Sequence, residues 1–166
     1  MLILITGEPG VGKTTILLKL FNMLKSYKVG GIIAKEIRSN GRIGFEFIDL
    51  SSNKRELLAS IHGNGPRVGK YYINLEGCKF AADILKNANN YDIILVDELG
   101  PMEFKSKEFR DAAKMLLDVN KIRIVVIHKR LKDTIIDEYK RRANAIITVT
   151  KENRDNIPDY ILKMIC

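Results

Sequence analysis

Eight residues near the start of the chain, Gly7 to Thr14, have the types and spacing needed to bind a polyphosphate. They read Gly-Glu-Pro-Gly-Val-Gly-Lys-Thr and fit the pattern G-x-x-x-x-G-K-[ST]. The glycines let successive backbone N–H groups point at phosphate oxygens, while Lys13 reaches the β- and γ-phosphates and Thr14 ligates Mg²⁺. The segment therefore predicts a cradle for a nucleotide polyphosphate, and the alternative is a glycine-rich turn without a ligand.

A second pair of candidate residues lies where a later apolar segment ends. Ile93 to Val96 is followed at once by Asp97 and Glu98. Ligands of parallel sheets bind outside the carboxyl ends of the strands, so we expect Asp97 to hold the Mg²⁺, directly or through water. Without a phosphate-binding loop, the same pattern is more often a simple acidic cap on a strand.

Glu98 is the candidate for activating water. Hydrolysis needs a group that orients or deprotonates the attacking water, and hydrolases of the small-GTPase kind use a glutamine for this. The chain contains no glutamine. We therefore expect Glu98 to act as the general base, with Lys13 as the second catalytic residue at the phosphates. The alternative is that Glu98 is only an exposed carboxylate at the end of a strand.

Four further residues are candidates for the same site. His128 follows the apolar segment Ile124–Ile127 and would face the γ-phosphate or the water if this strand lay between the other two. A structural histidine is the alternative. A cation that neutralises transition-state charge accelerates phosphoryl transfer, and Arg67, Lys70 and Arg130 are the candidates. A partner protein could supply this arginine instead.

Alternating helices and strands are predicted to position these residues. Leu2 to Ile5 indicates a buried strand before the loop, and about Lys13 to Tyr27 indicates a helix whose N-terminus faces the phosphates. Later strands are apolar throughout, as expected for a parallel sheet covered on both faces. The later helices are predicted over residues 79–88, 106–119, 131–142 and 155–165, and the later strands over 91–96, 122–127 and 145–149.

The middle of the chain has a different pattern. Val29-Gly30-Gly31 is a turn signal before a predicted strand over 32–37, and Asn40-Gly41 predicts a tight hairpin that returns in a strand over 43–50. Two more short strands are predicted, over 55–61 and 71–75. We therefore expect an antiparallel β-meander over about residues 32–75 inside a single domain spanning residues 1–166.

The composition narrows the protein class. A net charge of +8 attracts polyanions, but the basic clusters at 129–132 and 140–142 alternate with acids, so solvated faces are the simpler interpretation. Nucleic acid stays a candidate partner. Cys78 and Cys166 lie far apart and lack metal-ligand spacing. No apolar run is long enough for a membrane span or a leader, so we expect a cytoplasmic protein. We also expect a monomer.

Taken together, these motifs resemble those of the THEP-type nucleoside-triphosphatases, the family that includes the animal cancer-related nucleoside-triphosphatase. The most specific match is Asp97 to Glu103, because Gly-Pro-Met-Glu after a metal carboxylate is not a general feature of phosphate-binding loops. The other matching segments are 7–15, 36–45, 65–71 and 150–154, so the matches span nearly the whole chain.

This resemblance implies an α/β fold of the P-loop NTPase class, with a RecA-like, mostly parallel sheet flanked by helices. It also implies Mg²⁺-dependent hydrolysis of ATP, GTP and other nucleoside triphosphates, such as CTP and UTP, to diphosphate and phosphate, with broad base specificity. Two segments are implied to contact the nucleotide: Gly7, Glu8, Pro9, Gly10, Val11, Gly12, Lys13, Thr14 and Thr15, and Ile94, Leu95, Val96, Asp97, Glu98, Leu99, Gly100 and Pro101.

Two other function classes share the phosphate-binding loop. A nucleotide or polynucleotide kinase needs an acceptor pocket, usually has a lid that carries arginine, and gains nothing from a water-activating glutamate. A nucleotide-switched RNA-binding module is the other alternative, suggested by the charge, and its RNA binding would depend steeply on salt. Free phosphate released from ATP and Mg²⁺ alone would favour hydrolysis.

Overall fold

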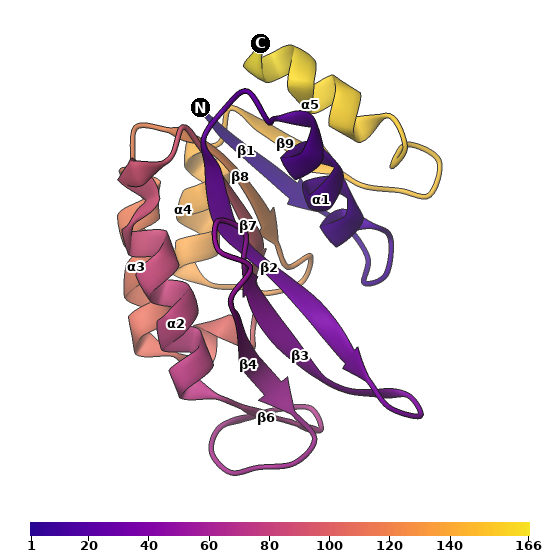
Figure 1. The fold of residues 1–166 in the computed structure, drawn as a ribbon, viewed down its shortest axis with the longest axis vertical. Helices are drawn as coiled ribbons and strands as arrows, with labels where there is room; N and C mark the ends of the chain where they lie inside the picture. The colour runs from indigo at the N-terminus through magenta and orange to yellow at the C-terminus, as the bar shows by residue number, and fades with distance from the viewer.

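The computed structural model describes all residues, 1–166, and its strands form one nine-stranded sheet in the order β5-β6-β4-β3-β2-β7-β8-β1-β9 (Figure 1). The neighbouring strands of its parallel part are β2 (Val29–Arg38), β7 (Ile93–Leu99), β8 (Ile122–Ile127), β1 (Leu2–Thr6) and β9 (Ala145–Thr148). The apolar runs that predicted buried parallel strands are therefore confirmed.

The antiparallel part continues the same sheet from β2. It consists of β3 (Arg42–Asp49), β4 (Arg55–Ser60), β6 (Tyr71–Ile73) and β5 (Arg67–Val68), each pairing with its neighbour in antiparallel fashion. At the predicted hairpin, Asn40 and Gly41 have φ angles of 52° and 107°. The predicted meander is confirmed, and it extends the core sheet rather than forming a separate unit.

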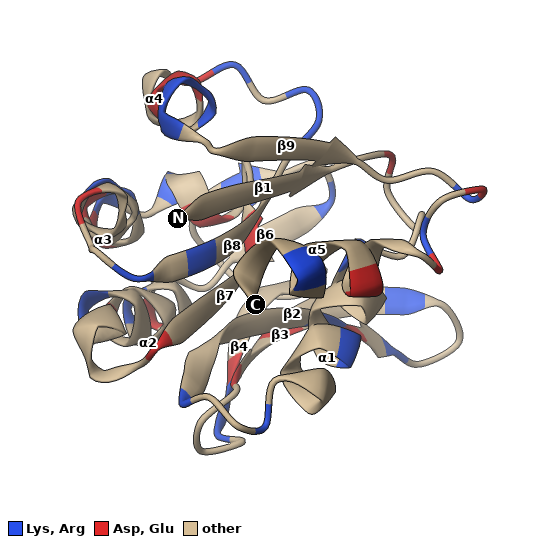
Figure 2. Ribbon diagram, turned by 90° about the horizontal axis from the view of Figure 1, so that it is seen from above, with Lys and Arg blue, Asp and Glu red and all other residues tan.

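Helices cover both faces of the sheet (Figure 2). One face packs against α1 (Lys13–Met23) and α5 (Ile157–Ile165), and the other against α2 (Leu75–Lys86), α3 (Lys107–Leu117) and α4 (Thr134–Arg142). Two short 3₁₀ helices, η1 (Ala88–Asn90) and η2 (Glu103–Lys105), lie beside β7. Side chains alternate along β1, so Ile3 and Ile5 pack into the core beneath α1 and α5. Leu2 and Leu4 pack into the core on the other face, beneath α2, α3 and α4. None of the helices has both the length and the apolar character of a membrane span.

The turn predicted at Val29-Gly30-Gly31 is wrong, because β2 already begins at Val29. The glycines are required by close packing instead. A Cβ on Gly31, where φ is +128°, would lie 1.8 Å from the carbonyl oxygen of Leu95, and one on Gly30 would lie 2.6 Å from the Tyr91 ring. A pair of glycines thus marks the place where β2 and β7 approach too closely for side chains.

Several helix bounds also differ from the predictions. Helix α1 ends at Met23 rather than at Tyr27, and α2 begins at Leu75, within the segment predicted as the end of a strand. Helix α4 begins at Thr134 rather than at Leu131, because the Asp133 side chain accepts a hydrogen bond from the N–H group of Ile135 (2.8 Å) and caps the helix. A side-chain cap of this kind determines the residue at which a helix begins, which the spacing of apolar residues does not specify.

Gly31→Ala is expected to lower the free energy of unfolding by more than about 3 kcal/mol, because the new Cβ meets backbone and the φ angle suits only glycine. Gly69→Ala is the matched control. The φ angle of Gly69 is +58°, and no atom lies within 4 Å of an added Cβ, so the expected loss is about 1 to 2 kcal/mol. Urea unfolding measures both losses, and equal values would contradict the close approach of β2 and β7.

Candidate active site

The phosphate-binding loop connects β1 to the first turn of α1. Gly10 and Gly12 have φ angles of 76° and 115°, and a Cβ on Gly7 would lie 2.8 Å from the carbonyl oxygen of Val149. No side chain caps α1, so the N–H groups of its first turn lack a side-chain acceptor, and an anion binds favourably at such a helix end. Lys13 bends back over the loop and donates from Nζ to the carbonyl oxygen of Gly7 (2.5 Å).

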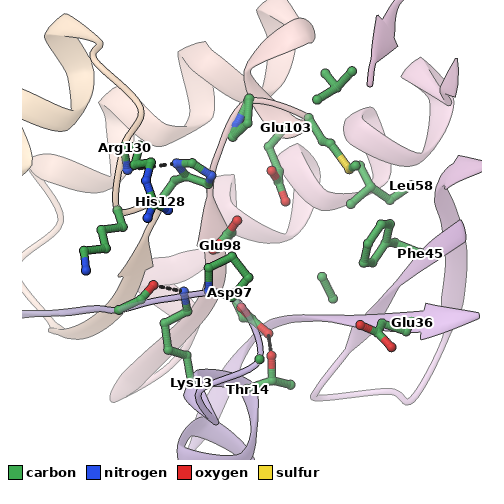
Figure 3. A pocket seen from close by; sticks show the side chains of 18 of the residues that line it. Lys13, Thr14, Glu36, Phe45, Leu58, Asp97, Glu98, Glu103, His128 and Arg130 are labelled. Atoms are coloured by element: carbon green, nitrogen blue, oxygen red, sulfur yellow. Dashed lines mark hydrogen bonds between the residues drawn. The ribbon is translucent and has the colours of Figure 1, made fainter. Parts of the chain in front are cut away.

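Asp97 lies beside this loop, as predicted from the end of the apolar strand. Thr14 Oγ1 donates a hydrogen bond to Asp97 Oδ2 at 2.6 Å, which joins residues that are 83 positions apart in the sequence (Figure 3). Asp97 is only 5% exposed. Burial raises the pKa of this carboxyl to about 7, while the hydrogen bond from Thr14 acts in the opposite direction.

The two side chains fit a magnesium ion. Carboxylate and hydroxyl oxygens are the hard ligands that Mg²⁺ prefers, and this ion usually takes one or two protein ligands beside phosphate oxygens and waters. The residues around the loop do not form a group of three or more His, Cys, Asp or Glu that could hold a metal by themselves. Thr14 and Asp97 therefore suit a metal that arrives with a triphosphate.

Glu98 is half-buried and lines the same cavity as Lys13. Burial raises the pKa of its carboxyl, and the positive charge of Lys13 lowers it. A third carboxyl group, that of Glu103, lies close by and is 3% exposed. A Cβ on Gly100 would lie 2.8 Å from Glu98 Oε1 and 3.1 Å from Glu103 Oε1, so Gly100 leaves the room that both carboxyl groups occupy.

Glu103 was missing from the predicted site residues. Burial and the neighbouring Glu98 raise the pKa of its carboxyl well above the usual value. The signal that could have found it is the Gly-Pro-Met-Glu segment itself, in which Glu103 is the last residue. From the sequence alone, a glutamate after a Pro-Met pair is expected to be an exposed charge. In the structure, the turn after β7 buries this side chain instead.

His128 lines the cavity, because β8 lies between β1 and β7. With this order of strands, His128 is expected to face the γ-phosphate or the attacking water. Its Nδ1 accepts hydrogen bonds from the backbone N–H groups of Arg130 (3.1 Å) and Leu131 (3.0 Å). Burial, Lys13 and Arg130 lower the pKa of the imidazole, so the ring is neutral at pH 7 and carries its proton on Nε2.

The pKa shift of His128 has a direct test. In an NMR titration of the ring protons, we expect the midpoint for His128 to fall below the ordinary value of about 6.5. His128→Ala should then remove this resonance and lower turnover, since the loop after β8 loses the acceptor that orders it. A midpoint above the ordinary value would mean that an acidic group, rather than burial and Lys13, controls this imidazole.

The structure brings one of the three predicted cations to the cavity. Arg130 lines it together with Lys129, and both side chains pair with Glu8 of the loop, at 2.8 and 2.9 Å. Arg67 and Lys70 do not line the cavity. They lie over the rings of Tyr72 and Tyr71 in the antiparallel part, at 5.0 and 5.5 Å from the ring centroids.

Most of the predicted nucleotide-binding residues divide into two groups, and the two exceptions are Glu8, which pairs with Lys129 and Arg130, and Gly100, which leaves room for two carboxyl groups. Those with surface in the cavity are Gly7, Pro9, Gly10, Lys13, Thr14, Asp97, Glu98 and Pro101, while Gly12 and Thr15 line an adjoining hollow. Ile94, Leu95, Val96 and Leu99 are buried in the sheet at 0–1% exposure, and Val11 packs into the core. Their part is to position Asp97, Glu98 and the loop, because side chains of a buried strand point into the layers above and below it.

The cavity has a volume of about 410 Å³ and continues beyond Glu98 into the antiparallel part of the sheet. Glu36, Arg42, Phe45 and Leu58 line this continuation. None of them was among the predicted site residues, since each sits on a strand that reads as ordinary β structure. Only the pairing of β2 with both β7 and β3 brings these residues next to the loop.

Known proteins are similar to this chain in fold and in sequence. A family model described as NTPase matches residues 2–162. The nucleoside-triphosphatase THEP1 of Methanopyrus kandleri is 40% identical, over 97% of this chain and 93% of its own. THEP1 of the hyperthermophile Aquifex aeolicus superposes with a TM-score of 0.89 at 34% identity, covering 99% of this chain and 98% of that one. A human cancer-related nucleoside triphosphatase superposes with a TM-score of 0.83 at 31% identity, covering 98% and 96%.

These similarities extend over nearly the full length of each chain, and they agree with the resemblance that the motifs indicated. They also match the observed architecture, in which a phosphate-binding loop and an acidic strand end share one edge of a mostly parallel sheet. The chain therefore belongs to the NTPase family.

Proposed function

We propose that the protein is a Mg²⁺-dependent nucleoside-triphosphatase that hydrolyses ATP, GTP, CTP and UTP to the diphosphate and phosphate. The observation that carries the proposal is the 2.6 Å hydrogen bond between Thr14 and Asp97, because it brings two side-chain oxygens together in the cavity that Lys13 and Glu98 also line. The names of the relatives, which describe nucleoside-triphosphatases, support it.

The residues of the site divide the work of hydrolysis. The N–H groups of the loop and the Lys13 ammonium bind the β- and γ-phosphates and neutralise charge that develops as the terminal phosphoryl group leaves. Glu98 orients the water and accepts its proton as the water oxygen attacks the γ-phosphorus. Thr14 and Asp97 would hold Mg²⁺, which would supply further neutralisation of the phosphates. The neutral His128 can donate from Nε2 to a phosphate oxygen.

Broad base specificity is supported by the segment after β9. In this segment, Asn153 forms hydrogen bonds within the loop itself and to the end of β9. Its Nδ2 donates to the carbonyl oxygen of Thr148 (2.9 Å), and its Oδ1 accepts from the N–H group of Thr150 (2.8 Å). The hollow beside Thr15 is lined instead by the charged side chains of Lys19, Arg154 and Asp155. Such groups hold a base without selecting one pattern of donors and acceptors.

Phosphate release from each of the four triphosphates, with Mg²⁺ and with EDTA, tests the proposal. We expect turnover of all four with Mg²⁺ and none with EDTA. Turnover of one nucleotide alone would contradict broad base specificity, and turnover in EDTA would contradict the metal site. Release from none of them would contradict hydrolysis itself.

A further inference from the structure

The cavity beside the loop has two chemically different sides. Its five hydrophobic lining side chains come from the antiparallel part of the sheet and the segments next to it: Ala34 of β2, which also borders the hollow beside Thr14 and Thr15, Phe45 of β3, Leu58 of β4, Val68 of β5 and Met102 of the turn after β7. We call the part they line the apolar chamber. On the other side, the lining is polar and includes Lys13, Thr14 and His128. Figure 3 shows Glu98 between Lys13 and the side chains of Phe45 and Leu58.

Hydrolysis alone does not require the apolar chamber. A water molecule occupies about 30 Å³ of the liquid, and a triphosphate tail is bound by polar groups. Apolar surface left in contact with water costs about 25 cal/mol per Å². Sites for small organic molecules, in contrast, are mostly apolar hollows with a few polar groups that fix orientation. The chamber therefore fits an organic molecule next to the terminal phosphate.

The polar groups around the chamber indicate the charge of that molecule. Arg42 donates to Glu36 (3.2 Å) and to the hydroxyl of Tyr71 (2.8 Å), so its guanidinium is already paired. Glu98 and Glu103 face the chamber from its inner end (Figure 3). Carboxyl oxygens accept hydrogen bonds from hydroxyl groups and disfavour a second anion. The surroundings thus suit a neutral molecule with a ring-sized apolar part and free hydroxyl groups.

We propose that the apolar chamber is an acceptor site and that the protein transfers the γ-phosphoryl group to a hydroxyl group of a nucleoside-like alcohol. The hydroxyl oxygen forms a bond to the γ-phosphorus, and the bond from this phosphorus to the β–γ bridging oxygen breaks. The hydroxyl proton passes to Glu98, and the nucleoside diphosphate leaves. The inference rests on the proposed function, because both reactions use the same loop and the same general base. It replaces the expectation that a kinase gains nothing from this glutamate, since Glu98 can accept the proton of either nucleophile, water or an alcohol.

The test uses γ-labelled ATP, Mg²⁺ and each of the four ribonucleosides in turn as probes. Labelled nucleoside phosphate and labelled free phosphate are measured in the same reaction. We expect label on at least one ribonucleoside. Met102→Trp and Val68→Trp fill the chamber from two different elements, and we expect each to lower the ratio of transfer to hydrolysis by at least about tenfold. Met115→Trp is the matched control, because Met115 is 53% exposed on α3, and it should leave the ratio unchanged.

The outcomes separate this inference from the proposed function. Free phosphate without label on any ribonucleoside would overturn the acceptor site while hydrolysis stands. Neither product would overturn both. Label transfer that persists at the same ratio in both chamber variants would also overturn the proposal, since the acceptor would then bind elsewhere.

Discussion

Phosphate release is expected to fall by at least about a hundredfold when Glu98 is replaced by glutamine. Glutamine has nearly the same size and shape, so the cavity and the loop keep their geometry, but an amide does not accept the proton of the attacking water. Lys13, Thr14 and the loop N–H groups are unchanged, so nucleotide affinity should stay close to that of the unmodified protein. Titration with a fluorescent triphosphate analogue measures the affinity, and phosphate release measures the rate.

Glu108→Gln is the control for Glu98→Gln, since Glu108 is an exposed glutamate in the first turn of α3. Its rate should match that of the unmodified protein. If Glu98→Gln kept its rate as well, another group would have to activate the water, and the assignment of Glu98 as the base would be wrong. If Glu98→Gln lost nucleotide binding, Glu98 would act in binding rather than in the chemical step.

Asp97→Asn is expected to lower Mg²⁺-dependent turnover by about a thousandfold while it stabilises the protein without metal. The loss of turnover follows from the loss of a charged metal ligand, which is worth several kcal/mol in the transition state. The gain in stability follows from burial. Because burial raises the pKa of Asp97 to about 7, the folded state binds a proton more tightly than the unfolded state does.

The sign of the stability effect can be followed with pH. In the unfolded chain, the Asp97 carboxyl has a pKa of about 4. Near this pH the same carboxyl is largely protonated in the folded protein, so its burial lowers the stability of the fold only slightly. As pH rises toward about 7, ionisation of the buried group lowers the stability of the folded state, and above this value the effect is complete. Thermal unfolding in EDTA should therefore show a larger advantage of Asp97→Asn at about pH 8 than at about pH 5.5. The same advantage at both values would mean that Asp97 remains ionised throughout.

The residues proposed to bind phosphate and metal could be located from the sequence because their signals are local. The loop sequence specifies its own backbone shape through Gly7, Gly10 and Gly12, and the apolar run before Asp97 indicates both a buried strand and the edge at which it ends. Two parallel strands with their carboxyl ends at one edge bring Thr14 and Asp97 together without further information.

The apolar chamber could not be predicted in the same way. Phe45, Leu58 and Val68 lie on strands whose register depends on long-range pairing, from β2 through β3 and β4 to β5 by way of β6. The sequence pattern of such a strand is the same whether its half-buried apolar residues face a core or a cavity. The error at Gly30 and Gly31 has a similar origin, because the contact that requires glycine comes from Leu95 and Tyr91, far away in the sequence.

A crystal structure with Mg²⁺ and a non-hydrolysable triphosphate analogue tests the central claim most directly. We expect the phosphates to accept hydrogen bonds from the loop N–H groups and from Lys13, and the metal to contact Thr14 Oγ1 in place of the hydrogen bond that this hydroxyl now donates to Asp97. A water should lie between Glu98 and the γ-phosphorus. A triphosphate bound away from Lys13, or a metal that contacts neither Thr14 nor Asp97 even through water, would contradict the account.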